Sequence, residues 1–485
     1  MASLFGVLTS LLLVYGLNNL VMVGLFLRRF DRRCREQKAF LEDFSTAEWP
    51  MVTTQIPVYN EINVVARVID AVCNMDYPTD RHCVQILDDS TDESSDLIDE
   101  RVAFHRDRGV DIQVIRRSER FGFKAGALHM AHLKVEGDFL AIFDADFVPP
   151  TDFLVKSVPF MMVKPKLGFL QARWEHLNRS SSWLSRAQAL GIDGHFMVEQ
   201  AGRCWNGLYL NFNGTAGLWR KQAIEEGGGW SWDTLTEDMD LSYRVQLAGW
   251  EAEYVPHLSV PAELPEDINA FKSQQFRWAK GSIQTALKIL PNLWEKEGLN
   301  FRFIQAFLHM THYLIHPLMV GMAVTSFFLL NLWNQLPLWM TTVFLGGVLV
   351  SMLSTNGLYL VSQWKLKRPR GQALRAMPGL MLLGVGIAVN NSRAVLQALR
   401  GKDSDFIRTP KRGDRGVMTY KVSIPVVVIF EIILGGLSLW TVWKHQVEAS
   451  WFQPFLLLYA FGFSLVGWTT LIHANRNWHP LKEAV

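Results

Sequence analysis

Acidic side chains follow two short apolar runs in the middle of this chain, and they are well suited to binding a cation. Segment 88–90 (Asp-Asp-Ser) ends one run, and segment 144–146 (Asp-Ala-Asp) ends another. One acidic strand end can be explained as a helix cap, but two that converge on one crevice are harder to explain structurally. Adjacent carboxylates repel unless a cation or donor groups neutralise them. Oxygen ligands of this kind suit Mg²⁺ or Mn²⁺ bridging to a diphosphate.

Three further segments contain residues that could act on such a ligand. Lys124 lies among glycines, where backbone can approach a phosphate at a helix start, although a surface lysine has the same pattern. Asp238 opens an amphipathic pattern, and taken alone it also fits helix capping or stabilisation of the helix dipole. Arg277 and Trp278 precede an amphipathic stripe that ends at Pro291 and indicates a helix along a membrane surface. The Arg–Trp pair alone would also fit an interfacial anchor.

Short apolar runs that alternate with helical patterns must position these residues. The predicted strands are Met51–Ile56, Val84–Leu87, Ile112–Ile115 and Phe139–Phe143. This alternation predicts a mostly parallel sheet, in which ligands bind beyond the carboxyl ends of the strands. The acidic segments fall at those ends.

The overall composition excludes several classes of protein. Charged residues make up 19% of the 485 residues, against about 25% in a soluble domain, so the chain is unusually apolar. A net charge of +2 excludes nucleic-acid binding driven by bulk charge. The four cysteines have no C-x-x-C spacing, which argues against a disulfide scaffold or a zinc cage. The sequence has no G-x-x-x-x-G-K-[ST] loop, and no G-x-G-x-x-G follows the first strand.

The apolar residues concentrate in runs that are long enough to cross a bilayer. The first charged side chain is Arg28, and no Asp, Glu, Lys or Arg occurs from Phe303 to Trp364. A spanning helix needs about 20 apolar residues, so five spans are predicted. They are Leu4–Leu27, Phe303–Trp333 and Leu338–Trp364, which turn at 334–337, followed by Val422–Trp443 and Trp451–Ile472.

Basic clusters orient these spans. Segments 28–33 and 365–370 are basic and are expected on the cytosolic side, which places the N-terminus outside and the C-terminus inside. The apolar run Ala376–Leu399 leads into a basic loop. An interfacial helix would keep that loop inside, whereas a sixth crossing would place it outside. Glu431 lies in the middle of a span and is expected to face the bundle interior or a polar path.

The predicted organisation follows from these assignments. It comprises an N-terminal transmembrane helix (1–30), a cytosolic catalytic domain (31–275), amphipathic interface helices (276–302), two transmembrane helices (303–364), an interface helix with a basic loop (365–421), and two transmembrane helices with a short tail (422–485).

The sequential pattern D, D-x-D, T-E-D and Q-Q-x-R-W, from about Met51 to Trp278, resembles processive family 2 glycosyltransferases of the cellulose synthase superfamily. The similarity is greatest to bacterial cellulose-synthase-like and plant mannan-synthase-like proteins. Segment 406–411 resembles the family's mobile gating loop, F-x-V-T-x-K, with Arg408 in place of Val. The resemblance covers most of the chain. It implies an α/β, GT-A-like nucleotide-sugar-binding cytosolic domain embedded between transmembrane helices of a multi-span integral membrane protein.

Matching positions imply a role for individual residues. The implied general base is Asp238, and the implied metal ligands are Asp144 and Asp146. The donor-binding positions are Tyr59, Glu61, Asp88, Asp89, Lys124, Asp144 and Arg277, and the acceptor-binding positions are Gln274, Trp278, Asn213, Gly214, Thr215 and Glu237. The gating-loop positions are Phe406, Arg408, Thr409 and Lys411.

The resemblance also implies the reaction and the partners. The expected activity is inverting transfer of a hexose, with Mg²⁺ or Mn²⁺, from UDP-glucose or GDP-mannose to a growing β-linked glycan such as β-1,4-glucan or mannan, which is then exported. The alternative is a glycolipid synthase that uses diacylglycerol or a similar membrane lipid. A non-enzymatic transporter would leave the acidic strand ends unexplained. An accessory export subunit is an open option, and nucleic acid is not an expected partner. The expected location is a bacterial plasma (inner) membrane, or the Golgi membrane if the source is eukaryotic.

Overall fold

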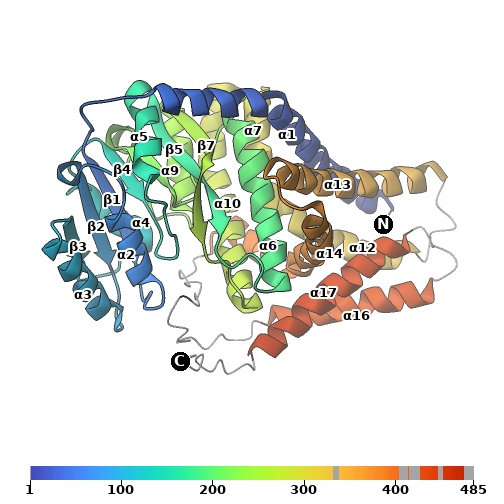
Figure 1. The fold of residues 1–485 in the computed structure, drawn as a ribbon. Coiled ribbons are helices and arrows are strands. Elements are labelled where there is room, and N and C mark those ends of the chain that lie inside the picture. The colour runs from blue at the N-terminus through green and yellow to red at the C-terminus, as the bar shows by residue number, and fades with distance from the viewer. Residues whose placement is uncertain (1, 331–337, 403–412, 414–425, 446–451, 475–485) are drawn as a thin grey trace.

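The computed structural model describes residues 2–330, 338–402, 413, 426–445 and 452–474. A mixed sheet with helices on both faces forms one end of the molecule, and long helices extend from it to the other end (Figure 1). The strands are β1 (Val52–Val58), β2 (His82–Asp88), β3 (Asp111–Arg116), β4 (Phe139–Ile142), β5 (Leu167–His176), β6 (Gly217–Arg220) and β7 (Glu251–Ala262).

Helices cover the sheet and join it to the apolar extension. Those within and next to the sheet domain are α1 (Ala2–Asp43), α2 (Val65–Cys73), η1 (Thr79–Arg81), α3 (Ser94–Asp107), α4 (Phe123–His132), α5 (Phe153–Val163), α6 (Trp183–Gly194), η2 (His195–Gln200), α7 (Ala201–Cys204), α8 (Lys221–Glu226), α9 (Glu237–Leu247) and α10 (Ile268–Glu297). Those that follow are α11 (Phe301–Met310), η3 (His312–Leu314), α12 (Ile315–Leu329), α13 (Leu338–Lys365), α14 (Arg370–Gly386), α15 (Ala388–Leu399), α16 (Val427–Lys444) and α17 (Gln453–Ala474).

The sheet has the order β3-β2-β1-β4-β6-β5-β7, and β6 alone runs antiparallel to its neighbours. The prediction of a mostly parallel sheet, with its first four strands, is therefore confirmed. Strand β1 pairs with β2 on one side and with β4 on the other, so the chain reverses its direction of winding at β1. A crevice forms at the carboxyl ends of strands that flank such a switch point. The acidic segments lie at this place.

Alternating side chains explain why these strands are buried on both faces. In β4, Phe139 and Ala141 join one apolar cluster, whereas Leu140 and Ile142 join the other. Helix α2 covers the first face with valines and an isoleucine at helical spacing. Inside the sheet, Gln55 Nε2 donates to Gln85 Oε1 at 3.0 Å across paired β1 and β2, which links two buried amides.

Helix α1 connects the apolar extension rigidly to the sheet domain. Its residues Met22, Phe26 and Phe30 are buried in the same apolar cluster as strands β4 and β5. Further along, Gln37 Nε2 donates to Glu253 Oε1 at 2.9 Å and to the Tyr254 carbonyl at 2.8 Å. Packing and hydrogen bonds of this helix therefore connect the apolar extension to β7.

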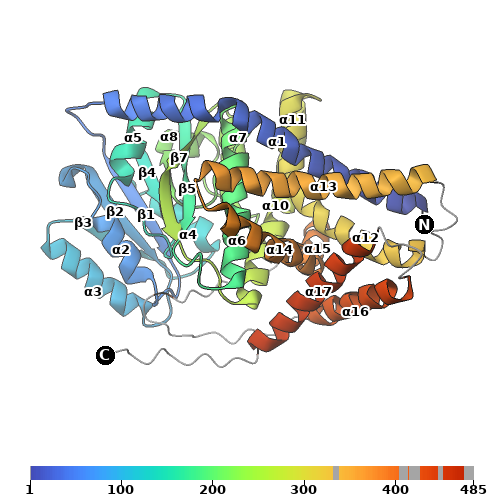
Figure 2. The same cartoon turned by 45° about the vertical axis from the view of Figure 1, so that its right-hand side comes forward.

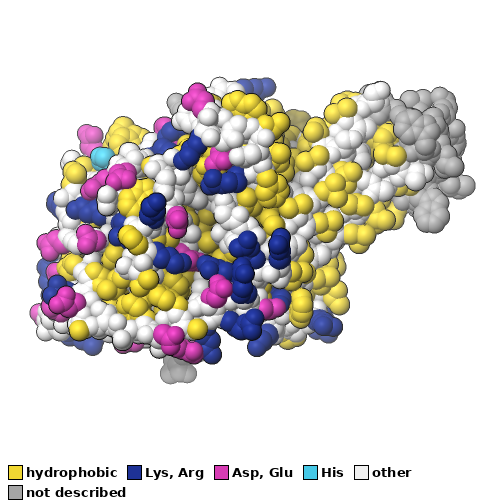
Figure 3. Space-filling view, turned by 90° about the horizontal axis from the view of Figure 1, so that it is seen from above, with side chains coloured by type: hydrophobic (Ala, Val, Ile, Leu, Met, Phe, Trp, Pro, Cys, Tyr) yellow, Lys and Arg dark blue, Asp and Glu magenta, His cyan; other side chains and the backbone are white. Residues whose placement is uncertain are grey.

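Five described helices are long and apolar enough to cross a membrane. They are Ser3–Asp43, His312–Leu329, Thr342–Lys365, Val427–Lys444 and Gln453–Ala474. Both ribbon views place α12, α13, α16 and α17 together on one side of the sheet domain (Figures 1 and 2). Seen from above, charged side chains gather over the sheet domain, and mainly hydrophobic ones cover the extension (Figure 3). This distribution is typical of a protein that is partly embedded in a bilayer.

The structure corrects the bounds of two predicted elements. The second span does not begin at Phe303, because 301–310 form the separate helix α11 and the apolar span starts at His312. Pro291 does not end the amphipathic helix, since it lies inside α10, which continues to Glu297. Ile283 and Ala286 of that helix are buried against protein rather than exposed to a membrane surface.

The run Ala376–Leu399 also differs from the single interfacial helix that was expected. It is part of two helices, α14 and α15, bent by 43°, which together pass the length and apolarity test for one broken span or a re-entrant loop. The described part of the chain therefore contains five candidate spans, or six if this pair counts as one. Glu431 is buried, as expected, and accepts from Lys272 Nζ at 2.8 Å. The turn at 334–337 and the gating-loop positions 406–411 lie outside the described residues.

Candidate active site

A pocket of about 210 Å³ opens at the carboxyl ends of β1, β2 and β4 and is closed on the far side by α9 and α10. Most of the positions that the sequence singled out line it. They are Tyr59, Glu61, Asp89, Lys124, Asp144, Asp146, Asn213, Gly214, Glu237, Asp238, Gln274, Arg277 and Trp278. Segments that are far apart in the sequence therefore meet in one cavity.

Lys124 links the acidic strand end to the opposite wall of the pocket. Gly122, with φ of 71°, starts α4, and this turn directs the lysine inward. Lys124 Nζ donates to Asp144 Oδ1 at 2.5 Å and to the Gly214 carbonyl at 2.8 Å, and it lies 3.9 Å from Glu237 Oε1. Burial opposes the charge of the lysine, but the surrounding carboxylates outweigh it and raise the pKa of Lys124. The ammonium therefore stays protonated at neutral pH.

Glu237 and Asp238 occupy the first turn of α9, where the helix dipole favours negative charge. Asp238 Oδ1 accepts from the Met239 N–H at 2.8 Å. Burial and the neighbouring Glu237 nevertheless raise the pKa of Asp238 to about 8. Burial also raises the pKa of Glu237, against the opposing charge of Lys124. A carboxylate whose pKa is close to the working pH is suited to proton transfer.

The loop before β6 approaches Asp238 closely, and this approach requires a glycine. Gly214 has φ of 79°, and a Cβ placed there would lie 2.9 Å from Asp238 Oδ2. Next to it, the Asn213 side chain lies 3.2 Å from His195 Nε2 and accepts from Gln200 Nε2. The loop thus brings backbone against the carboxylate while its side chains are fixed by η2.

Arg277 and Trp278 project from α10 into the same pocket. Burial lowers the pKa of Arg277 to about 10, although the carboxylates of Glu237 and Asp144 favour its charge. The guanidinium remains protonated at neutral pH and faces the acidic wall. Trp278 lies 6.4 Å, between ring centroids, from Trp174, which stacks on Phe196 at 4.9 Å. These rings form an aromatic wall beside the charged groups, as suits the C–H faces of a sugar.

Two arginines after β3 were missed by the sequence analysis, and one of them, Arg120, lines the pocket. Arg117 donates to both oxygens of Asp89, at 2.9 and 2.5 Å. The Arg120 guanidinium lies 3.3 Å from the centroid of the Tyr59 ring, and its Nε lies 3.9 Å from Asp89. The basic run after β3 was the available signal. This stack of a cation on an aromatic ring is a site where a planar nucleobase could also bind.

Two of the singled-out residues do not line the pocket. Asp88 ends β2 with its side chain buried, where it accepts from the Ser95 hydroxyl at 3.0 Å and from Arg116 Nε at 2.8 Å. Successive strand residues face opposite ways, so only Asp89 reaches the cavity. Thr215 is buried behind the site, and its Oγ1 accepts from the Asp144 N–H at 2.8 Å. Its contact holds the backbone of a pocket residue.

The carboxylates of the pocket can be compared with the ligands that a divalent cation needs. No group of three or more His, Cys, Asp or Glu side chains that could hold a metal occurs among the described residues. Asp144 and Asp146 both line the pocket, and Mg²⁺ is often bound by one or two carboxylates plus substrate phosphates. The two aspartates therefore fit an ion that a diphosphate helps to bind.

Comparison with known proteins gives a consistent set of relatives. A family model described as glycosyltransferase like family 2 matches residues 50–281. A probable glucomannan 4-beta-mannosyltransferase 15 of Arabidopsis thaliana is 36% identical over 365 residues, which cover 71% of this chain and 67% of that protein. Glucomannan 4-beta-mannosyltransferase 9 of the same plant is 39% identical over 58% of this chain and 55% of its own length.

A rice protein and one solved structure show how far the similarity extends. A probable glucomannan 4-beta-mannosyltransferase 7 of Oryza sativa is 43% identical over 51% of this chain and 43% of its own length. The chain thus spans two thirds of the first relative and about half of the other two. The mannosyltransferase PcManGT from Pyrobaculum calidifontis, solved with GDP-Man and Mn²⁺, is 19% identical, with a TM-score of 0.47, over 76% of this chain and 99% of its own.

Proposed function

Because this chain belongs to glycosyltransferase family 2, we propose that it is a membrane-embedded hexosyltransferase that lengthens a β-linked polysaccharide from a nucleotide sugar. One observation supports this most strongly. A buried carboxylate of raised pKa, Asp238, lies in one cavity with the cations Lys124 and Arg277 and with the pair Asp144 and Asp146. Transfer of a sugar from a diphosphate needs a base for the acceptor and positive charge for the leaving group.

Asp238 is the proposed general base. It accepts the proton of the acceptor hydroxyl as that oxygen forms a bond to the anomeric carbon of the donor sugar. The bond from this carbon to the diphosphate breaks, and the nucleoside diphosphate departs with the bonding electrons. Attack from the face opposite the leaving group converts an α-linked donor into a β-glycoside. No covalent enzyme intermediate is required, since the acceptor itself displaces the diphosphate.

Positive charge in the pocket stabilises the departing diphosphate. Arg277 is charged at neutral pH and can donate two parallel hydrogen bonds to phosphate oxygens. The Lys124 ammonium neutralises the carboxylate of Asp144. It also stabilises the negative charge that develops on the departing diphosphate. A Mg²⁺ or Mn²⁺ ion held by Asp144 and Asp146 would supply further Lewis-acid stabilisation. At the other end, Tyr59 offers a ring for the nucleobase.

The acceptor is proposed to be a glycan rather than a lipid. Trp278 and Trp174 offer aromatic faces to sugar rings, and Gln274 adds a hydrogen-bonding amide. The plant relatives are named as glucomannan 4-beta-mannosyltransferases, which supports mannose as the transferred hexose and a β-linked mannan or glucomannan as the product. Export of that product through the apolar helices, with or without an accessory subunit, is part of the proposal.

The same proposal includes a topology. Basic segments 28–33 and 365–370 support a catalytic domain on the cytosolic side of the membrane. The plasma membrane and the Golgi membrane are both compatible with five candidate spans.

Membranes that contain the chain provide the test. Radiolabelled GDP-mannose and UDP-glucose are supplied separately, and Asp238→Asn membranes serve as the inactive control. Ethanol-insoluble label that a mannanase or a cellulase releases is the expected result. Label in a lipid-soluble monoglycoside would instead assign the chain to glycolipid synthesis. Equal incorporation by the Asp238→Asn membranes would overturn the proposed base.

A further inference from the structure

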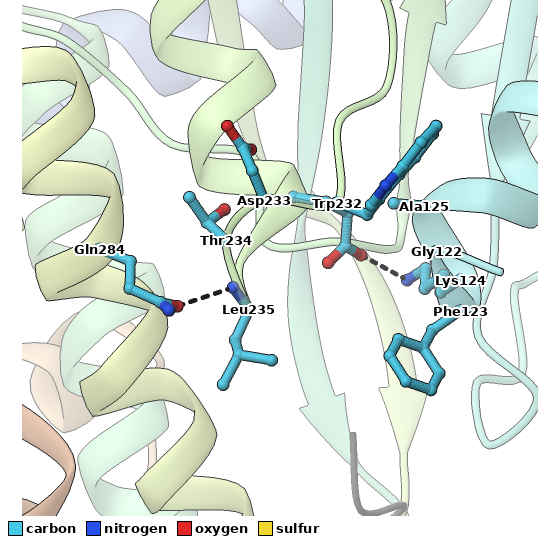
Figure 4. A pocket seen from close by; sticks show the side chains of 10 residues that line it. Gly122, Phe123, Lys124, Ala125, Trp232, Asp233, Thr234, Leu235 and Gln284 are labelled. Atoms are coloured by element: carbon cyan, nitrogen blue, oxygen red, sulfur yellow. Dashed lines mark hydrogen bonds and ion pairs between the residues drawn. The ribbon is translucent and has the colours of Figure 1, made fainter. Parts of the chain in front are cut away.

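A second cavity, of about 200 Å³, lies next to the catalytic pocket and has no role in the reaction described above (Figure 4). The two cavities share three lining residues, Lys124, Leu235 and Glu237. The second cavity is otherwise built by the start of α4, by the loop that precedes α9, and by Gln284 of α10. A ligand that fills the cavity would lie against these shared residues.

An exposed indole forms one wall of this cavity. Trp232 retains 43% of its surface, although Phe121 packs against it edge-on at 5.2 Å and His129 at 5.8 Å between centroids. A Cβ at Gly122 would lie 2.9 Å from the indole, so the absence of a side chain there makes room for the ring. The tryptophan is therefore held in place and still offers surface to a ligand.

The polar groups beside the indole include one without a partner. Thr234 is 8% exposed, and its Oγ1 has no hydrogen-bond partner. Because this oxygen has almost no exposed surface, it contacts a ligand in the cavity only after rotation of the Thr234 side chain. Next to it, Gln284 Oε1 accepts from the Leu235 N–H at 3.1 Å, which fixes the carboxamide at the rim of the cavity (Figure 4).

The charges in this cavity compensate one another. Lys124 is paired with Asp144 and lies near Glu237, and Asp233 accepts from Lys288 Nζ at 2.9 Å. An anionic ligand such as a free phosphate would have to displace one of these carboxylates. A neutral ligand with one apolar face and several hydroxyls fits the aromatic wall, the unpartnered hydroxyl and the amide together.

We propose that this cavity is a second saccharide subsite, which takes a neutral pyranose unit with its C–H face on Trp232 and its hydroxyls on Gln284 and, after rotation of its side chain, on Thr234. Its occupant changes catalysis through the shared residues Lys124 and Glu237. The choice of mannose and glucose oligomers as probes rests on the proposed function, whereas the subsite itself does not.

Equilibrium binding without turnover tests this subsite. The full chain with Asp238→Asn, in lipid nanodiscs and without nucleotide sugar, is titrated with mannotriose and with cellotriose by saturation-transfer NMR. Saturable binding of at least one oligosaccharide is expected, with a loss of about tenfold or more in affinity on Trp232→Ala. The control is Trp294→Ala, which removes an indole that is 50% exposed outside both cavities and is expected to leave the affinity unchanged.

A second pair of variants separates the subsite from the catalytic pocket and from misfolding. Thr234→Val removes the unpartnered hydroxyl at nearly constant volume, so weaker binding with unchanged thermal stability supports the subsite. Binding that survives Trp232→Ala and is lost on Trp278→Ala would overturn it, as would no binding of either sugar.

Competition then identifies the source of the pyranose. Displacement by GDP-mannose or UDP-glucose, but not by GDP or UDP alone, would mean that the donor's own hexose reaches Trp232. No displacement would mean that a free or nascent glycan occupies the subsite. Failure of the wild-type chain to transfer hexose would overturn the proposed function but would leave this binding result unaffected.

Discussion

The raised pKa of Asp238 predicts how the reaction depends on pH. The base must be ionised to accept the proton of the acceptor, and its pKa in the free enzyme is about 8. At pH 7 about one tenth of the molecules have this carboxylate ionised, and at pH 6 about one hundredth. We therefore expect kcat/KM for hexose transfer to rise about tenfold per pH unit below pH 8 and to level off above it.

The rising part of this pH profile, its acidic limb, should shift when the neighbouring Glu237 is replaced. Its negative charge raises the pKa of Asp238, second only to burial, and it shares Lys124 with that residue. Glu237→Gln removes the like charge and leaves Lys124 to act more strongly on Asp238. Both effects favour the ionised base, so the limb should shift to lower pH. Asp99→Asn is the matched control, since it removes an exposed carboxylate that pairs with Arg116 and should leave the profile unmoved.

The assay measures initial rates of nucleotide release with donor and acceptor both well below saturation, from pH 6 to pH 9.5. The chain is held in nanodiscs at constant metal and ionic strength. A rate that is flat across this range, or a limb that stays in place in the Glu237→Gln variant, would refute the assignment of Asp238 as the base.

Three further outcomes follow from the same geometry. Asp238→Asn should reduce the turnover number by about 10²–10⁴-fold with little change in donor binding, as measured by nucleotide release and calorimetry. Asp144→Asn should raise the Mn²⁺ concentration for half-maximal activity, and chelation should abolish transfer by the wild type; unchanged metal dependence would contradict the proposed ligand. Glu431→Ala should destabilise the chain by about 3–5 kcal/mol in thermal unfolding, because it leaves Lys272 buried without its partner, whereas Lys272→Met with Glu431→Leu should restore most of the loss.

Four strands were predictable because each is a short apolar run that ends in a turn or a carboxylate. The remaining three were not, for different reasons. Strand β6 begins with a glycine and ends with the charged Arg220, and β7 contains Pro256 and Pro261 and pairs with β5 through a shift in register. Gln171 and Arg173 interrupt the apolar pattern of β5. Their buried side-chain N–H groups donate hydrogen bonds to backbone carbonyls. Such pairing over long sequence distances leaves no local signal.

The site shows the same division between local and distant information. The family resemblance, confirmed by the family model and the plant relatives, supplied thirteen of the residues that line the pocket. It did not separate Asp88 from Asp89, since only the direction of each side chain at the end of β2 decides which one reaches the cavity. Arg120 was missed because its place over Tyr59 depends on packing between two loops. The predicted end of the amphipathic helix at Pro291 was wrong, because tertiary contacts maintain α10 beyond this residue.

The stereochemistry and length of the product test the central claim most directly. The purified chain in nanodiscs receives α-linked GDP-mannose and mannotriose, and the products are analysed by proton NMR and mass spectrometry. Inverting transfer by Asp238 predicts new β-linkages in a series of products that differ by one hexose, with none from the Asp238→Asn variant. New α-linkages, or the same β-linked series from the variant, would contradict it.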